Sequence, residues 1–268
     1  NGGDNVGNLD LVKVLTFNSI DGYEWIQDLG MKFDDFISQG AGSLWQRTHT
    51  SKQDMGTGFI SVYSQKLEDL SDKINVIVET TADEIIMEDG KAVGAKVVDN
   101  HSEKEYNVKA KDGVILATGG FAANADMVQE YNTSGKWDDL SEVSTTNRFS
   151  SSQGDGIVMA EKAGADLVDM DLIQLLYLGN TQNGQLTKYP PRDVNGTDQI
   201  IFINKEGKRF VREDGRRDDI SKASLAQTDG MFYMLESGDG EGYKDINDPE
   251  WKSLNGLYIQ NLMMKTFR

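Results

Sequence analysis

Apolar side chains recur at helical spacing in four parts of the chain. Residues 9–33 carry them every three or four positions, which predicts two helices with a stop at Gly30. Residues 55–73 predict an amphipathic helix after a glycine-rich entry, and residues 218–227 predict a short helix with an aspartate as its N-cap. Residues 154–168 predict another helix that opens at Gly-Asp-Gly. Its apolar face is formed by Ile157, Ala160, Ala163 and Leu167.

Runs of β-branched residues predict strands in the middle of the chain and near residue 200. Within residues 74–121 the predicted order is one strand, an antiparallel meander and a short buried strand at 114–117. Asp-Gly at 89–90 and Asn-His at 100–101 mark the hairpin turns of the meander. Residues 199–211 predict a β-hairpin that turns at Glu-Gly, and we expect Arg209 and Phe210 to lock this hairpin to its domain.

The pattern changes near residue 170, where alternating helices and strands give way to an irregular stretch. Residues 181–198 hold the clustered turn formers of the chain, including two adjacent prolines. We therefore expect an α/β domain over residues 1–170 and an α+β domain over residues 171–268.

Composition and charge narrow the class of protein. The 268 residues are 38% hydrophobic and 26% charged, which is typical of a globular protein, and no apolar run has the ~18 residues that a membrane span needs. The net charge of -17 disfavours nucleic acid and anionic lipid as partners. An anionic substrate would need locally concentrated arginine, which residues 188–217 offer.

The chain has no cysteine and only two histidines. This excludes disulfides, thiolate catalysis, iron–sulfur ligation and a histidine-rich zinc site within the chain. Absence of cysteine fits an exported protein slightly better than a cytosolic one, so we expect an extracytoplasmic location. No G-x-S-x-G elbow supports a serine hydrolase, and no signal-peptide pattern opens the sequence.

Residues 111–121 combine an apolar strand with Ala-Thr-Gly-Gly. Paired glycines after a strand let a ligand or another backbone approach closely. The alternative is a tight turn with Gly119 at positive φ. No G-x-G-x-x-G follows a strand, so the usual pyrophosphate-binding fingerprint is absent from this chain.

Three ordered motifs, at residues 110–131, 153–174 and 201–227, resemble the FAD-dependent fumarate reductase/succinate dehydrogenase flavoprotein family. The soluble branch of flavocytochrome c fumarate reductases and urocanate reductases is the most similar, and the resemblance covers residues 7–230. It implies the central part of an FAD-binding domain of the glutathione-reductase-like type, followed by much of a capping domain. The chain is then an internal fragment, which we expect to bind FAD poorly and to be inactive on its own.

The resemblance implies four residues that contact non-covalently bound FAD. Ala82 would meet the adenine through its backbone, and Thr118 and Gly119 would lie beside the adenosine. Asp155 would hold a polar group of the flavin, and the alternative is that it only caps its helix.

The resemblance also implies a catalytic residue, Arg217, as the proton donor. Flavin N5 would deliver hydride to the β-carbon of a 2-enoate while Arg217 protonates the α-carbon. Its reprotonation would pass through a carboxylate, which falls on Asp193. The second arginine of this relay falls on Gly196, a departure from the family for which Arg192 or Arg216 would have to substitute.

The expected substrate-binding residues are Tyr177 and Arg216. Fumarate reductases carry a histidine in the region of Tyr177, and a tyrosine there resembles the urocanate reductases. The alternative is that Tyr177 only packs in an apolar run. Arg47 and His49 resemble a family stretch near the flavin, although a lone histidine is more often structural.

The sequence thus predicts an FAD-dependent reductase of a small unsaturated carboxylate such as fumarate or urocanate. A haem or FMN module outside this chain would supply electrons, as in anaerobic respiration. The enzyme alternative is a flavin dehydrogenase of the ketosteroid dehydrogenase type, and the other alternative is a non-catalytic binding module.

Overall fold

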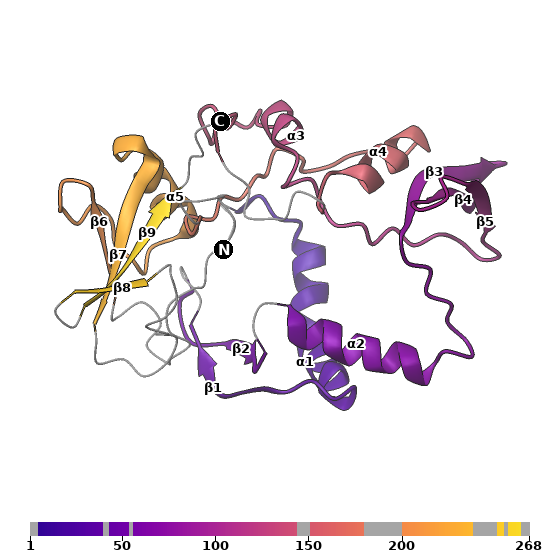
Figure 1. Ribbon diagram of the computed structural model, residues 1–268, viewed down its shortest axis with the longest axis horizontal. Helices are drawn as coiled ribbons and strands as arrows, with labels where there is room; N and C mark the ends of the chain where they lie inside the picture. The colour runs from indigo at the N-terminus through magenta and orange to yellow at the C-terminus, as the bar shows by residue number, and fades with distance from the viewer. Residues whose placement is uncertain are drawn as a thin grey trace. The chain divides into compact units, whose positions relative to one another are not determined.

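The computed structural model divides the chain into two units, which we describe separately (Figure 1). One unit comprises residues 1–38 and 46–76, and the other comprises residues 39–45 and 77–268. The structure describes residues 5–39, 43–53, 56–143, 151–179, 200–237, 251–254 and 257–263.

The first unit contains two helices, α1 (Leu9–Asp28) and α2 (Thr57–Asp69), and the strand pair β1 (Phe33–Ser38) and β2 (Thr48–Ser51). The side chain of Asn8 caps α1 by accepting from the backbone N–H groups of Asp10 and Leu11. The prediction of two helices here was wrong, because no proline interrupts residues 9–28 and one interior glycine is tolerated in a helix. The helix ends just before Gly30, whose φ of 108° stops it as expected.

The predicted meander is confirmed in the second unit. Strands β3 (Thr80–Glu88), β4 (Lys91–Asp99) and β5 (Glu105–Lys109) pair antiparallel in the order β3-β4-β5. Asp89 and Gly90 both have positive φ, 50° and 76°, as a two-residue hairpin turn of type I′ requires.

The two strands predicted on either side of this meander are absent. Residues 74–78 and 114–117 form no strand, and Ile115 is 93% exposed. A strand forms only where a neighbouring strand supplies partners for its backbone N–H and C=O groups. Within the described residues no strand lies beside either segment. Both apolar segments therefore remain unpaired and keep exposed apolar side chains.

Helices α3 (Ala125–Glu130) and α4 (Asp155–Lys162) follow the meander. The predicted helix after Gly-Asp-Gly is present but ends at Lys162, so Leu167 lies beyond it. Its buried residues are Gly156 and Met159 rather than the expected apolar face. The early stop places Gly164 at φ 95° just after the helix.

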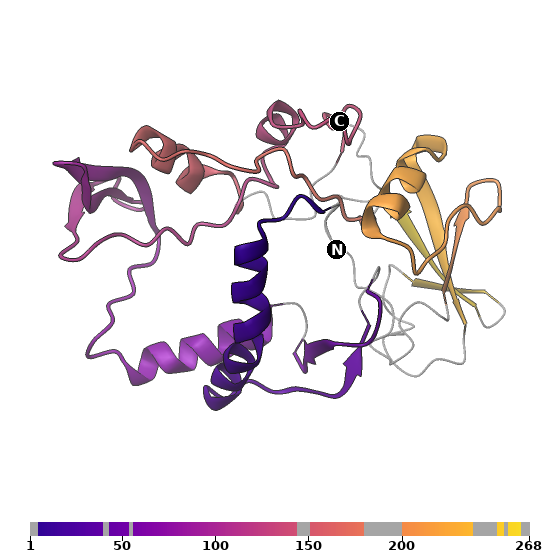
Figure 2. The same cartoon turned by 180° about the vertical axis from the view of Figure 1, so that it is seen from behind.

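The C-terminal sheet has four antiparallel strands in the order β6-β7-β9-β8. The strands are β6 (Ile200–Asn204), β7 (Met231–Ser237), β8 (Trp251–Leu254) and β9 (Leu257–Met263). Helix α5 (Arg217–Leu225) contacts β7, as both views of the ribbon show (Figures 1 and 2), and a 3-10 turn (Thr228–Gly230) leads into that strand.

The hairpin predicted around Glu206 is reduced to a single bridge between Ile203 and Arg209. The strand that pairs with β6 is β7, which follows in sequence only after α5. The chain leaves the hairpin direction after Arg209, because Glu213 turns back to bind both that arginine and β6.

One buried core lies in the second unit, beside the C-terminal sheet. It joins residues from both sides of position 170, and its ring contacts include Tyr177 with Phe202 at 5.7 Å. Its buried members are Trp137, Leu140, Leu175, Tyr177, Leu178, Ile200, Phe202, Ile220, Phe232 and Met234. The domain boundary near residue 170 stays a prediction. Among the described helices, none is long and apolar enough to cross a membrane.

Candidate functional site

A glycine turn packs against the start of α4. Gly119 has φ 75°, and the carbonyl of Gly120 accepts from the Gly154 N–H at 3.1 Å. Gly154 is the N-cap of α4 at φ 92°, in the left-handed region. A Cβ on Gly156 would lie 1.9 Å from Thr118 Oγ1, so only glycine lets the turn and the helix approach this closely.

The same contact is reinforced by a second segment. Asn124 donates to the Gln153 carbonyl at 3.0 Å, and the Ala123 N–H donates to the Ser152 carbonyl at 3.0 Å. Three of the predicted cofactor residues, Thr118, Gly119 and Asp155, therefore come from two segments that meet.

Asp155 is exposed in the first turn of α4. The N-cap of α4 is Gly154 and not Asp155, so the alternative that Asp155 caps the helix is wrong. A carboxylate in the first turn faces helix N–H groups that have no partner within the helix. Ala82 lies in β3 opposite Val97 of β4, and α4 contacts β3.

These residues fit a flavin nucleotide. A Cβ on Gly119 would meet only the Ser152 hydroxyl, at 3.6 Å, and a Cβ on Gly120 would meet nothing within 4 Å, so the turn is open to a close ligand. Backbone N–H groups, a hydroxyl and an exposed carboxylate suit the polar groups of such a cofactor. The four residues predicted to contact FAD stay predictions.

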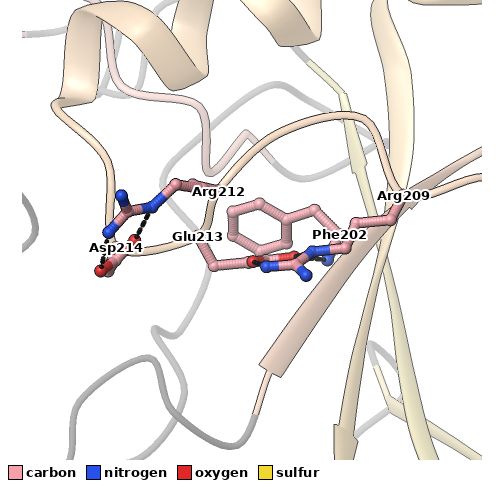
Figure 3. A network of polar contacts seen from close by, with 5 residues as sticks. All are labelled: Phe202, Arg209, Arg212, Glu213 and Asp214. Atoms are coloured by element: carbon pink, nitrogen blue, oxygen red, sulfur yellow. Dashed lines mark hydrogen bonds and ion pairs between the residues drawn. The ribbon is translucent and has the colours of Figure 1, made fainter.

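The segment before α5 is locked by a buried carboxylate (Figure 3). Glu213 is 4% exposed, and its Oε1 accepts from the Phe202 N–H at 2.8 Å and from Arg209 Nε at 3.1 Å. Its Oε2 accepts from Arg209 Nη2 at 2.6 Å, which makes the pair bidentate. Hydrogen bonding to Glu213 raises the pKa of Arg209 above its usual range. Phe210 packs edge-to-face on Phe232 of β7 at 5.6 Å, whereas Arg209 pairs with Glu213 within its own segment, so the locking of this segment to a capping domain stays a prediction.

Arg212 forms a second bidentate pair, with Asp214, at 2.9 and 2.7 Å (Figure 3). The hydrogen bonds between these two side chains lower the pKa of Asp214 and raise the pKa of Arg212. Arg212 is 78% exposed, so this pair is a solvated surface contact.

Arg216 and Arg217 stand at the start of α5. Arg216 is its N-cap and approaches Asp218 Oδ2 to 3.8 Å, so the predicted aspartate N-cap was wrong. Arg217 is exposed, and within the described residues it has no ion-pair partner. Of the arginines in residues 207–224, Arg217 alone keeps its guanidinium un-neutralised by the part of the chain that the structure describes.

The remaining candidate site residues are buried, lie in the first unit or fall outside the described residues. Tyr177 is 2% exposed in the core, a location that favours the packing alternative, and its substrate role stays a prediction. His49 lies 4.3 Å from the ring of Tyr23 and 6.2 Å from that of Phe33, an aromatic cluster in the first unit. Asp193, Arg192 and Gly196 lie outside the described residues.

Sequence reasoning missed the dipeptide Lys136-Trp137, which contacts α5. Lys136 Nζ lies 2.6 Å from Asp218 Oδ2, and Trp137 is 5% exposed. A tryptophan in a polar, turn-rich stretch, Ser-Gly-Lys-Trp-Asp-Asp, was the available signal, since such a residue is rarely free of the core.

Comparison with known proteins places these features in a family context. The family described as FAD binding domain matches residues 1–236. NADH:acrylate oxidoreductase from Vibrio harveyi is 36% identical over 239 residues, which are 88% of this chain and 23% of the relative. Urocanate reductase from Eggerthella lenta is 35% identical over 266 residues, which are 98% of this chain and 42% of the relative.

Solved structures with this fold include the open conformation of a flavocytochrome c3 fumarate reductase. Its TM-score is 0.67 at 26% identity, over 88% of this chain and 40% of that one. A 3-ketosteroid-delta4-(5alpha)-dehydrogenase from Rhodococcus jostii RHA1 has a TM-score of 0.56 at 21% identity, over 82% of this chain and 48% of that one. The latter is a likeness of fold alone. This chain spans less than half the length of each of these proteins.

Proposed function

This chain belongs to the FAD binding domain family, and from that premise we propose that the protein containing it reduces the C=C bond of a 2-enoate. The resemblance to this family, the α/β class and FAD as the cofactor are confirmed by the family match and the fold. The reaction and its substrate are the proposal. Acrylate, urocanate and fumarate, after which the relatives are named, are all α,β-unsaturated carboxylates.

The observation that carries the proposal is the exposed guanidinium of Arg217 at the N-terminus of α5, which forms no ion pair with any residue that the structure describes. Bound FAD, once reduced, supplies the hydride in this chemistry. Arg217 would bind the substrate carboxylate through its planar fork and give its proton to the α-carbon. A guanidinium is a very weak acid, so its main contribution would be to stabilise the negative charge that develops at the substrate.

Two further roles are part of the proposal. Thr118, Gly119, Ala82 and Asp155 would hold FAD, and Asp193 would return a proton to Arg217. Arg216 already approaches Asp218, so we assign it to orienting the first turn and to the substrate carboxylate. The ketosteroid dehydrogenase alternative is supported only by a likeness of fold.

The test is an assay of the intact protein with reduced viologen against a panel of 2-enoates. Arg217→Lys should lower kcat on the best substrate by about 100-fold or more, since loss of one positioned donor to developing charge has this size. Arg212→Lys is the matched control, because it changes an exposed arginine that is already paired and should keep the wild-type rate.

Two outcomes contradict the proposal in different ways. If no 2-enoate reoxidises the dye in the presence of wild-type protein, the reaction class is wrong. If Arg217→Lys retains near wild-type rates, the reaction stands but the proton donor is another residue.

A further inference from the structure

The dipeptide Lys136-Trp137 contacts helix α5 near both ends of the helix. Lys136 Nζ lies 2.6 Å from Asp218 Oδ2 in the first turn. Lys222 Nζ, in the last turn, lies 5.5 Å from the ring centroid of Trp137, within the range of a cation–π contact. Asp218 and Lys222 are four positions apart and therefore share one face of the helix.

This dipeptide is itself firmly held. The indole of Trp137 is buried and donates to the Ile173 carbonyl at 2.9 Å. Asn132 donates to the carbonyl of Asp138 at 2.7 Å, which fixes the backbone just after the dipeptide. The backbone that carries Lys136 is therefore fixed by its buried neighbour Trp137.

The ion pair at Asp218 is partly shielded from water. The side chain of Asp218 is 18% exposed and that of Lys136 is 29% exposed. Charge pairs in such partly buried places interact more strongly than surface pairs, because the effective dielectric constant is lower. Arg216 Nη2 lies 3.8 Å from the same carboxylate oxygen, so Asp218 links Lys136 to the residue just before α5.

Arg217 lies between Arg216 and Asp218 in sequence, at the end of the buried face of α5. Ile220, Ser221 and Ser224 are all buried and lie three, four and seven positions further on, so they share a face with Arg217. Ser221 anchors this face by donating to the Leu175 carbonyl at 3.2 Å. Beyond Ile220, the start of the first turn, which carries Arg217 and Asp218, is where a helix frays.

We propose that Lys136, through its ion pair with Asp218, is a positioning residue that holds Arg217 for proton donation. This inference rests on the proposed function. A reacting group has to stay within about 0.5 Å of its productive position, and a displacement of about 1 Å costs up to 100-fold in rate. Without Lys136, Asp218 loses its ion pair with the dipeptide, so the start of the first turn is held less firmly, while Arg217 itself is unchanged.

The kinetic test uses Lys136→Met and Asp218→Asn in the intact protein. Each should lower kcat by about tenfold or more and change KM by less than about twofold, because the substrate still meets the same guanidinium. Lys136→Arg should restore most of the rate by rebuilding the ion pair. The matched control is Lys96→Met, which removes the pair of Lys96 with Glu105 at 2.7 Å in β4 and β5 and should leave kcat unchanged.

A second measurement does not depend on activity. The Ile220 N–H donates to the Arg216 carbonyl at 3.0 Å, the first hydrogen bond of α5, and its hydrogen exchange reports on the first turn. Lys136→Met should accelerate this exchange about tenfold or more, and Lys96→Met should not change it.

The two hypotheses fail in separable ways. If the wild-type protein reduces no 2-enoate, the proposed function fails, and unchanged exchange at Ile220 would show independently that Lys136 does not hold the turn. If the wild type is active and Lys136→Met keeps its kcat, the positioning role is overturned and the proposed function stands. If Lys136→Met and Asp218→Asn both unfold at the assay temperature, the pair is a folding contact and the positioning role is also overturned.

Discussion

At the scale of single residues, one aspartate shows how a local hydrogen-bond set changes an acid. Asp99 Oδ1 accepts from the Ser102 N–H at 2.8 Å, from the Ser102 hydroxyl at 2.9 Å and from the His101 N–H at 3.1 Å. The Ser102 backbone bond is the main cause of a pKa below the usual Asp range, followed by the bond from its hydroxyl. These bonds favour the charged form, so Asp99 stabilises the turn between β4 and β5.

The sign of the pH dependence follows from this direction. A lowered pKa means that the contribution of Asp99 is complete above the pKa of an unfolded aspartate, about 3.9, and is lost as the pH falls through the lower folded value. Ser102→Ala should raise the pKa of Asp99 but leave it below 3.9, because the backbone bond remains. Ser102→Thr, which keeps the hydroxyl, is the control. Carboxyl NMR titration measures both, and an unchanged pKa in Ser102→Ala would contradict the role of the hydroxyl.

At the scale of elements, the contact between α4 and the glycine turn depends on the missing side chain of Gly156. An alanine there would place its Cβ 1.9 Å from Thr118 Oγ1 and 2.9 Å from Thr118 Cβ. Gly156→Ala should lower the free energy of unfolding by about 1–3 kcal/mol, the usual cost of overpacking. It should also weaken FAD retention in the intact protein, because it separates Thr118 from Asp155. Urea unfolding and flavin absorbance measure the two effects.

Gly22 provides the matched control. It lies inside α1 with nothing within 4 Å of a Cβ, so Gly22→Ala should raise stability by about 0.5–1 kcal/mol. Adding Thr118→Gly to Gly156→Ala should restore most of the loss. Equal effects of the two alanine substitutions would show that close approach at Gly156 has no energetic weight.

Elements defined by local chemistry were predictable from the sequence. The meander was, because Asp89-Gly90 specifies a tight hairpin turn and the alternation on either side needs no distant partner. Strand β7 was not, because its partners β6 and β9 are set by long-range pairing. The site divides in the same way: the turn at Gly119 was visible as a motif, whereas the contact of Lys136 with Asp218 joins residues far apart in sequence.

At the scale of the whole molecule, the open apolar runs are the feature to test. Ile115 is 93% exposed in a segment whose sequence is that of a buried strand. Ile115→Glu should therefore change the stability of this chain by less than about 0.5 kcal/mol, as surface substitutions do. In the intact protein we expect the same change to cost 2 kcal/mol or more. Calorimetry measures both losses of stability. Equal losses in this chain and in the intact protein would contradict the expectation that Ile115 is buried in the intact protein.

The buried core that includes Trp137 and Leu140 has a practical consequence for recombining relatives of this protein. A chimaera whose crossover falls between residues 140 and 175 would take part of this one core from each parent. This would hold even for a junction that interrupts no helix or strand. Shuffling that keeps residues 132–140 from the same parent as α5 would preserve matched partners. Compatible junctions in this fold are thus set by which side chains are buried together, and not by where one element ends and the next begins.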